Sequence, residues 1–279
     1  LMHYIIQEDI FKENHYRLLL ETVERFGFSY DVVRVFPFVD KFVNVKNIPQ
    51  SFDVDELPDY NINEENVFAF GAVKLARLAK KENWKPGSLL NDNHDYNVYK
   101  NFYKENLLNF DSKVVCFSDA FHWKKGERKF IRPCKDSKVF TGKTFTKDEW
   151  EEFSSFALTS GHNSSLDEKT EIQVCSVKPI QKEIRFWCVD GKIVTGSQYR
   201  LGNKTVYSKE FDEEAMLFAQ KMVDMYQIAD AFVIDVCLTE DKWKIVELNC
   251  INCAGFYLCD LSKLIGAIEE KFGQTIKVN

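Results

Sequence analysis

The pattern of apolar and polar positions from Val233 to Asn249 predicts two short apolar strands joined by a charged turn. Asp235 interrupts the first apolar run and would point away from its buried face, because successive side chains of a strand alternate between two faces. Glu247 and Asn249 lie two residues apart in the second strand, so they share one face. The pattern therefore predicts a hairpin that carries three oxygen-bearing side chains.

The loop of this hairpin decides whether its two carboxylates meet. In a regular antiparallel ladder, a loop of even length would send Asp235 and Glu247 to opposite faces. We therefore expect a loop of three residues, 240–242, with Thr239 paired to Trp243. That register makes a site of hard oxygen ligands with open coordination positions, which suits Mg²⁺ carrying a nucleotide. Each acidic residue taken singly could instead be a solvated charge on a strand.

Before residue 120, the pattern alternates between short strands and helices. Apolar runs predict three strands, at residues 3–7, 30–38 and 66–71. Helical periodicity predicts two helices, at about residues 9–26 and 72–81. The acidic segment 39–63 reads as a long connection, and the polar segment 91–95, which contains His94, reads as a solvated loop. This order is a βαβ pattern, which predicts a parallel sheet.

The pattern changes after the basic stretch HWKKGER, and we place a domain boundary there, between residues 2–120 and 121–279. The second part reads as strands within 129–145 and at 171–177, followed by a hairpin at 182–200 that turns at Asp190-Gly191. Helices are predicted at residues 146–157, about 212–226 and about 260–272. In the first of these helices, Thr146 and Glu149 have capping-box spacing. The fold class is therefore α/β (α+β).

Composition adds limits to this picture. The 279 residues are 45% hydrophobic, which is enough for packed cores, and the net charge of -6 argues against a general nucleic-acid binder. No apolar run has the length of a membrane span, and the first residues lack a secretory signal pattern, so we expect a cytoplasmic protein. The eight cysteines are scattered through apolar segments, which favours reduced, buried thiols over a disulfide framework.

Basic residues gather in the polar loop that follows residue 131. Arg132 lies within a strand, and Lys135, Lys138 and Lys143 follow in a short polar loop, so the cluster could hold the β- and γ-phosphates of a nucleotide. Each lysine alone could be a solvated charge. Further on, the backbone from Cys175 to Val177, just before Lys178, could bind an adenine edge through its N–H and C=O groups.

Three more charged residues belong to the predicted hairpin at 182–200. Glu183 and Arg185 share one face of its first strand, where the carboxylate could accept ribose hydroxyls and the guanidinium could meet phosphate. They could instead form ion pairs with each other or with neighbours. Arg200 ends the second strand and is the candidate to stabilise charge on a transferring phosphoryl group.

The order of these elements resembles the ATP-grasp fold. The resemblance rests on FIRPCKDSKVFTGK, KEIRFWCVDGKIVTGSQYR and FVIDVCLTEDKWKIVELN, and it extends from about residue 120 to 260. Within that superfamily the chain looks most like the divergent clade named for one arginine and two lysines. That clade has phage and bacterial members and is related to the cell-division-cycle factor that helps assemble translation initiation factor 2. The upstream βαβ region would correspond to the small domain that precedes ATP-grasp modules.

The resemblance implies that ATP and Mg²⁺ are held between two lobes. It assigns the metals to Asp235, Glu247 and Asn249, the phosphates to Arg132 and Lys138, and the ribose and phosphate region to Glu183 and Arg185. The sequence also departs from the family pattern. The usual glycine-rich lid over the phosphates is missing, since Gly142 is the only glycine between Arg132 and Thr144.

Two classes of function follow from the resemblance. The first is an ATP- and Mg²⁺-dependent ligase that joins a carboxylate to an amine through an acyl phosphate, acting on a small molecule, a peptide or a protein. The complete set of oxygen ligands favours this class, because phosphoryl transfer needs them. The alternative is an ATP-binding assembly chaperone or protein-binding module without turnover.

Overall fold

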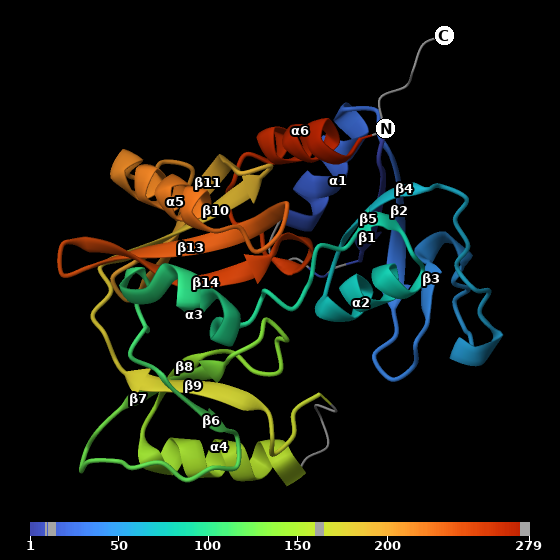
Figure 1. Cartoon of the computed structure of the whole chain (residues 1–279). Helices are drawn as coiled ribbons and strands as arrows, with labels where there is room; N and C mark the ends of the chain where they lie inside the picture. The colour runs from blue at the N-terminus through green and yellow to red at the C-terminus, as the bar shows by residue number, and fades with distance from the viewer. Residues whose placement is uncertain (9, 11–14, 160–164, 274–279) are drawn as a thin grey trace.

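The computed structural model describes residues 1–8, 10, 15–159 and 165–273, and their strands form three sheets (Figure 1). The helices of the described residues cover the outer faces of these sheets and fill the junctions between them (Figure 1). None of the described helices has both the length and the apolar character needed to cross a membrane. The fold is mixed α/β, as the sequence pattern predicts.

The N-terminal sheet has the strand order β3-β2-β1-β4-β5. Its strands are β1 (His3–Gln7), β2 (Ser29–Val35), β3 (Phe42–Asn44), β4 (Asn66–Phe70) and β5 (Lys85–Gly87). The strand β1 pairs in parallel with both β2 and β4, so the predicted βαβ arrangement is confirmed. The helices are α1 (His15–Arg25) and α2 (Val73–Lys81). The predicted start of α1 at residue 9 lies outside the described residues.

Two expectations for the N-terminal part are wrong. The segment 39–63 is not a plain connection, because β3 lies in it and pairs antiparallel with β2. The segment 91–95 is not a solvated loop, because His94 is buried and Asp95 caps a helix that the pattern did not predict, α3 (Tyr96–Tyr103). Its aromatic and asparagine residues have low helix propensity, so the helix depends on burying three tyrosines of one face.

The smallest sheet has the order β6-β9-β7-β8. Its strands are β6 (Lys113–Cys116), β7 (Lys129–Pro133), β8 (Lys143–Phe145) and β9 (Glu171–Ser176). The helix α4 (Lys147–Thr159) covers its outer face at the bottom of Figure 1, over a core that includes Ile131 and Trp150. Thr146 and Glu149 exchange hydrogen bonds of 2.7 and 3.3 Å, which confirms the capping box. The division at residue 120 stays a prediction.

The central sheet is antiparallel throughout, in the order β12-β11-β10-β13-β14. Its strands are β10 (Lys182–Val189), β11 (Lys192–Leu201), β12 (Lys204–Ser208), β13 (Ala231–Thr239) and β14 (Lys242–Cys250). On one face, Ile184 and Ile234 pack with α5 (Glu213–Met225). On the other face, Trp187 and Val233 pack with α6 (Leu261–Phe272) and the N-terminal sheet. The Asp190-Gly191 turn is confirmed, with positive φ at both residues.

The hairpin of β13 and β14 contains one correction. Thr239 pairs with Lys242, so the loop has two residues, Glu240 and Asp241, whose φ angles of 48° and 58° suit a tight turn of the primed type. The expected three-residue loop is therefore wrong. Asp235 still lies opposite Glu247, because the register shifts by one residue at a bulge beside Asp235. The meeting of the two carboxylates is confirmed, although by another route.

Candidate functional site

A cavity of about 520 Å³ lies between the smallest sheet and the central sheet. Nine of the residues singled out in the sequence line it: Arg132, Lys143, Val177, Lys178, Glu183, Arg185, Arg200, Asp235 and Glu247. The first four come from the smallest sheet and the segment after it, and the other five come from β10, β11, β13 and β14. The fold thus gathers side chains that lie more than a hundred residues apart in the sequence.

Arg185 and Asp235 form the most deeply buried ion pair of this wall. They lie opposite each other on β10 and β13, and the Arg185 Nε and Nη2 atoms donate to the two Asp235 oxygens at 2.8 Å each. The side chains are only 7% and 0% exposed. Burial raises the pKa of the Asp235 carboxyl to about 7, against the opposing effect of the Arg185 guanidinium. Asp235 therefore depends on Arg185 for its charged form.

Glu247 shares the wall with Asp235 and meets two guanidinium groups. Arg132 on β7 donates to one of its oxygens, and Arg185 Nη2 lies 3.8 Å from the other. Burial alone would raise the pKa of the Glu247 carboxyl, but Arg132, Lys138 and Arg185 outweigh it and hold this pKa well below its usual range. Glu247 is therefore an ionised carboxylate at neutral pH.

Lys138 reaches the same wall from the loop between β7 and β8. Its Nζ atom donates to Asn249 Oδ1 at 2.7 Å and lies 2.6 Å from an Asp136 oxygen. The other Asp136 oxygen accepts from the backbone N–H of Cys250 at 2.8 Å, so Asp136 ties this loop to the end of β14. Lys138 has a φ of 55°, a conformation that non-glycine residues seldom adopt outside turns and functional loops.

Glu183 lines the same cavity, and each of its two carboxylate oxygens accepts a hydrogen bond. Arg200 donates to one of its oxygens and the Tyr199 hydroxyl donates to the other. Both neighbours can face Glu183 because Arg200 pairs with Glu183 while Gln198 pairs with Ile184, which leaves Tyr199 in a bulge. In this structure Glu183 therefore pairs with neighbours rather than with Arg185, which pairs with Asp235.

Tyr257 is a site residue that the sequence reasoning missed. The Arg185 Cζ atom lies 4.6 Å from the centre of its ring, and the ring stacks on Tyr199 with centroids 4.9 Å apart. Its φ is 51°. Tyr199, Asp136 and Tyr257 were all missed, because they lie in a bulge and in loops where strand alternation gives no direction. The signal in the sequence was the proximity of Tyr257 to the Glu-x-Asn segment, close after Gly255.

The predicted adenine segment is placed in part along the cavity. Val177 is 48% exposed and lines the cavity, as does Lys178, whose ammonium group is held by Asp111 at 2.6 Å. Cys175 does not present its side chain there, because the thiol is buried against the Phe130 carbonyl at 3.8 Å. The expected contact uses the backbone of this segment, and it stays a prediction.

The oxygen set of the hairpin fits a metal that arrives with phosphates. Asp235, Glu247 and Asn249 offer two carboxylates and an amide, and the described residues contain no group of three His, Cys, Asp or Glu side chains that could hold a metal ion alone. Arg132, Lys138 and Arg185 contact these oxygens, and Asp136 adds a third carboxylate beside Lys138, so three positive charges face three negative ones. A Mg²⁺ ion would add uncompensated positive charge that the phosphates of a nucleotide would offset, which favours magnesium carried by a nucleotide over free Mg²⁺.

A small antiparallel sheet that faces a larger one, with basic groups on the first and oxygen-bearing side chains on the second, is the arrangement of an ATP-grasp protein. The chain belongs to the ATP-grasp domain family that is family 3 of the clade named for one arginine and two lysines, and the model of that family matches residues 36–268. This confirms the clade resemblance drawn from the sequence motifs.

Solved structures show the same fold. The D-alanine–D-alanine ligase of Bacillus anthracis superposes with a TM-score of 0.53 at 13% identity, over 98% of this chain and 93% of that one. A structure of the same ligase complexed with ATP gives a TM-score of 0.53 at 14% identity, over 97% and 96%. A comparison with curated protein sequences found no match. At these identities the likeness extends to the fold alone.

Proposed function

We propose that this protein is an ATP- and Mg²⁺-dependent ligase that joins a carboxylate to an amine through an acyl phosphate. One observation carries the proposal: Asp235 and Glu247 line the cavity with Arg132 and Arg185, and Asn249 of the same hairpin is buried beside them in contact with Lys138 and Asp235. Phosphoryl transfer needs this combination of oxygen ligands and positive charge around the transferring group. The ATP-grasp fold, found also in an ATP complex of a ligase, agrees with it.

In the proposed complex, the residues of the cavity and those in contact with them divide by chemistry. Asp235, Glu247 and Asn249 would hold Mg²⁺, which would shield the phosphoryl charge. The phosphates would be bound by the cationic side chains of the opposite lobe, Arg132, Lys138 and Lys143. Glu183 would meet the ribose, and the segment of Cys175, Val177 and Lys178 would meet the adenine. Arg185 and Arg200 would stabilise charge on the transferring group.

The proposed reaction has two steps. A carboxylate oxygen of the first substrate attacks the terminal phosphorus of ATP, the bond from that phosphorus to the bridging oxygen breaks, and ADP leaves. The amine nitrogen of the second substrate then attacks the acyl carbon, inorganic phosphate leaves, and the nitrogen loses a proton. The protein contributes by orienting the groups and neutralising charge, because the transferred group itself needs little covalent help.

Nucleotide binding is tested with Glu247→Gln, which removes one negative charge but keeps the shape of the side chain. Calorimetry with Mg²⁺ and a non-hydrolysable ATP analogue should show binding to the parent protein and at least a tenfold weaker affinity in the variant. The matched control is Glu151→Gln, an exposed residue of α4 outside the lining of this cavity, which should bind like the parent. Equal affinities in all three proteins would contradict the metal assignment.

Turnover separates the ligase from an assembly chaperone. A ligase should release ADP and phosphate only when both a carboxylate and an amine substrate are supplied, and Arg200→Ala should keep nucleotide affinity while lowering that rate. The control for Arg200 is Arg128→Ala, whose guanidinium contacts Glu149 on the exposed surface. Bound ATP that is retained without turnover across candidate substrates would favour the chaperone.

A further inference from the structure

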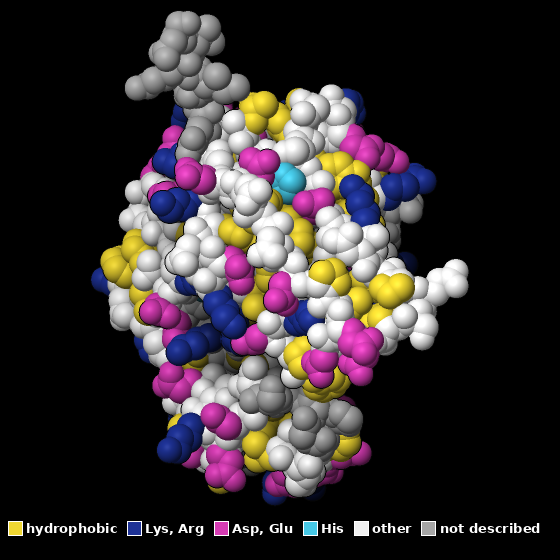
Figure 2. Space-filling model, turned by 90° about the vertical axis from the view of Figure 1, so that its right-hand side faces the viewer, with side chains coloured by type: hydrophobic (Ala, Val, Ile, Leu, Met, Phe, Trp, Pro, Cys, Tyr) yellow, Lys and Arg dark blue, Asp and Glu magenta, His cyan; other side chains and the backbone are white. Residues whose placement is uncertain are grey.

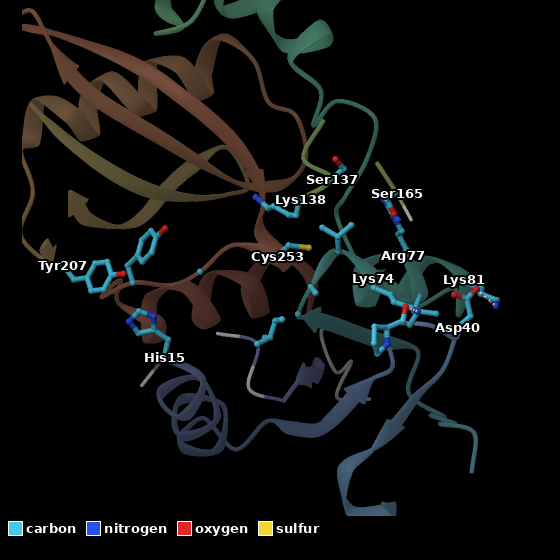
Figure 3. A pocket seen from close by; sticks show the side chains of 18 residues that line it. His15, Asp40, Lys74, Arg77, Lys81, Ser137, Lys138, Ser165, Tyr207 and Cys253 are labelled. Carbon is cyan, nitrogen blue, oxygen red and sulfur yellow. Dashed lines mark hydrogen bonds and ion pairs between the residues drawn. The ribbon is translucent and has the colours of Figure 1, made fainter. Parts of the chain in front are cut away.

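A second cavity, of about 990 Å³, lies beside the first one and is nearly twice as large (Figure 3). A third cavity of about 310 Å³ joins them: it shares Glu247 and Arg185 with the nucleotide cavity, and Lys138 and Gly255 with the large one. Tyr257 lines all three. The large cavity therefore opens onto the wall where the proposed phosphoryl transfer takes place.

The two ends of the large cavity differ in chemistry. Figure 3 shows Lys74, Arg77 and Lys81 projecting from α2 at one end, and His15 and Tyr207 at the other. Lys138 and Cys253 lie between the two ends (Figure 3). We call the end formed by Lys74, Arg77 and Lys81 the basic end. One carboxylate in the described lining, Asp40, lies there.

The positive charge of the basic end is only partly neutralised. Lys81 lies 3.5 Å from Asp40, which balances one charge. The Lys74 ammonium donates to the backbone carbonyls of Pro37 and Val39 at 3.0 and 2.6 Å, and these carbonyls carry no net charge. The Arg77 guanidinium is exposed and has neither an ion pair nor a hydrogen bond with any described residue. Two positive charges are thus left facing the cavity.

The N-terminus of the helix α2 adds to the positive electrostatic potential of the large cavity. Gly71, Ala72 and Val73, at the N-terminus of α2, also line the large cavity. The N–H groups of Gly71 and Ala72 are bonded to the Asn252 carbonyl and to Gln7 Oε1, but the helix dipole still adds partial positive charge at this end of α2, near Lys74. The chain as a whole is acidic, with a net charge of -6, so the excess of positive charge is a local property of the described residues that line this cavity.

We propose that the large cavity binds an acidic peptide, with a side-chain carboxylate held at the basic end by Arg77 and Lys74. The inference rests on the proposed function, because the peptide would be the carboxylate substrate and its reacting carboxyl would lie near Lys138. The volume of about 990 Å³ is at the upper limit for a small-molecule site, which suits several linked residues better than one free amino acid.

An extended polyanion such as RNA fits the surface less well than a peptide does. Acidic and basic side chains are interspersed over the face shown in Figure 2, with no continuous basic stripe. Nucleic-acid binding depends on neutralising many phosphates in a row, whereas the basic end offers charge for one or two carboxylates. A single guanidinium group can bind one carboxylate side chain through two parallel hydrogen bonds.

The test measures direct binding of two labelled peptides, tetraglutamate and tetraglutamine, to the full chain with and without Mg²⁺ and a non-hydrolysable ATP analogue. Fluorescence anisotropy should show at least tenfold tighter binding of tetraglutamate, and that preference should shrink as salt rises. Arg77→Gln should weaken tetraglutamate binding about tenfold. The matched control is Lys80→Gln, on the same helix but outside the lining of this cavity, which should bind like the parent.

The outcomes separate this inference from the proposed function. Equal binding of the two peptides, or equal effects of Arg77→Gln and Lys80→Gln, would overturn the inference. Tight binding of an oligonucleotide of matched charge with no peptide binding would also overturn it. A different result would contradict the proposed function, namely that the parent protein does not bind the Mg²⁺–nucleotide complex. The preference for tetraglutamate over tetraglutamine could still be measured in that case. Arg77→Gln should keep the parent's nucleotide affinity and melting temperature, because its side chain is exposed.

Discussion

At the scale of single residues, the sequence identified groups whose polarity breaks an apolar strand. Asp235 is such a residue, and the structure places it at 0% exposure with both oxygens bound by Arg185. The sequence could not identify the partner, because Glu183 and Arg185 share a face of β10, so Arg185 could have paired with Glu183 or with a carboxylate of a neighbouring strand. The pairing of β10 with β13 identifies the partner, because Arg185 lies opposite Asp235 and Glu183 lies opposite Cys237.

This pairing makes a prediction about stability. Asp235→Asn would leave the Arg185 guanidinium buried without its main counter-charge, and the remaining carboxylate, Glu247, is 3.8 Å away. Breaking a buried ion pair by removing one partner costs about 3–5 kcal/mol, so we expect a loss of about 3 kcal/mol in the free energy of unfolding. Urea unfolding of the variant without nucleotide measures it.

The matched control for this stability measurement is Asp190→Asn, which breaks an exposed pair with Lys271. Its midpoint in urea should stay close to the parent's, because exposed ion pairs contribute little. An equal loss of stability in the two variants would show that the Arg185 pair is not special.

At the scale of elements, the sequence predicted most strands and helices but neither of the bulges that aim the site. The alternation of side chains between two faces holds only in a regular strand ladder, so it predicted a three-residue loop after Thr239. The chain instead has a two-residue loop and a bulge. The bulge that contains Tyr199 was hidden for the same reason. The capping box at Thr146 was predictable because it depends on local spacing alone. The helix α3 was not, because its stability comes from tertiary burial of its tyrosines.

Gly142, the residue immediately before β8, leads to a prediction at this scale. A Cβ atom added to it would lie 2.7 Å from Arg132 Cβ and 3.2 Å from the Phe130 ring, so β8 can approach β7 closely only with glycine there. Gly142→Ala should displace Arg132, weaken binding of Mg²⁺ and nucleotide at least several-fold, and cost about 1–3 kcal/mol of stability. Calorimetry and urea unfolding check the two effects.

The control for Gly142→Ala is Gly266→Ala in the helix α6, where an added Cβ meets no atom within 4 Å. Alanine is the better helix former, so this variant should gain about 0.5–1 kcal/mol and bind nucleotide like the parent. If Gly142→Ala bound nucleotide as tightly as Gly266→Ala, nucleotide binding would not depend on the close approach of β8 to β7.

At the scale of the whole molecule, the candidate site is also the junction between two sheets. Arg132 and Lys138 come from the smallest sheet and its loop, and they bind Glu247 and Asn249 of the central sheet. These partners are separated by 115 and 111 residues in the sequence. No periodicity in the sequence reports which faces of two sheets meet, so the sequence predicted the members of the site by resemblance but not their contacts.

A nucleotide in the cavity should therefore strengthen the junction itself. The phosphates would contact the basic side chains of the smallest sheet, and Mg²⁺ would contact the oxygens of the central sheet. Ligand bound only to the folded state stabilises it by about 2.7 kcal/mol at a concentration of one hundred times Kd. We expect a clear rise in melting temperature with Mg²⁺ and the ATP analogue, and slower amide hydrogen exchange in β7 and β9.

Lys138→Gln tests whether this stabilisation acts across the junction. The variant loses the charge that contacts both Asn249 and Asp136, so its gain in melting temperature at the same nucleotide concentration should fall by more than half. Lys125→Gln changes an exposed lysine outside the cavity lining and should show the full gain. If Lys138→Gln gained as much as Lys125→Gln, and exchange in β7 and β9 slowed equally in both, the nucleotide would not link the two sheets through this loop.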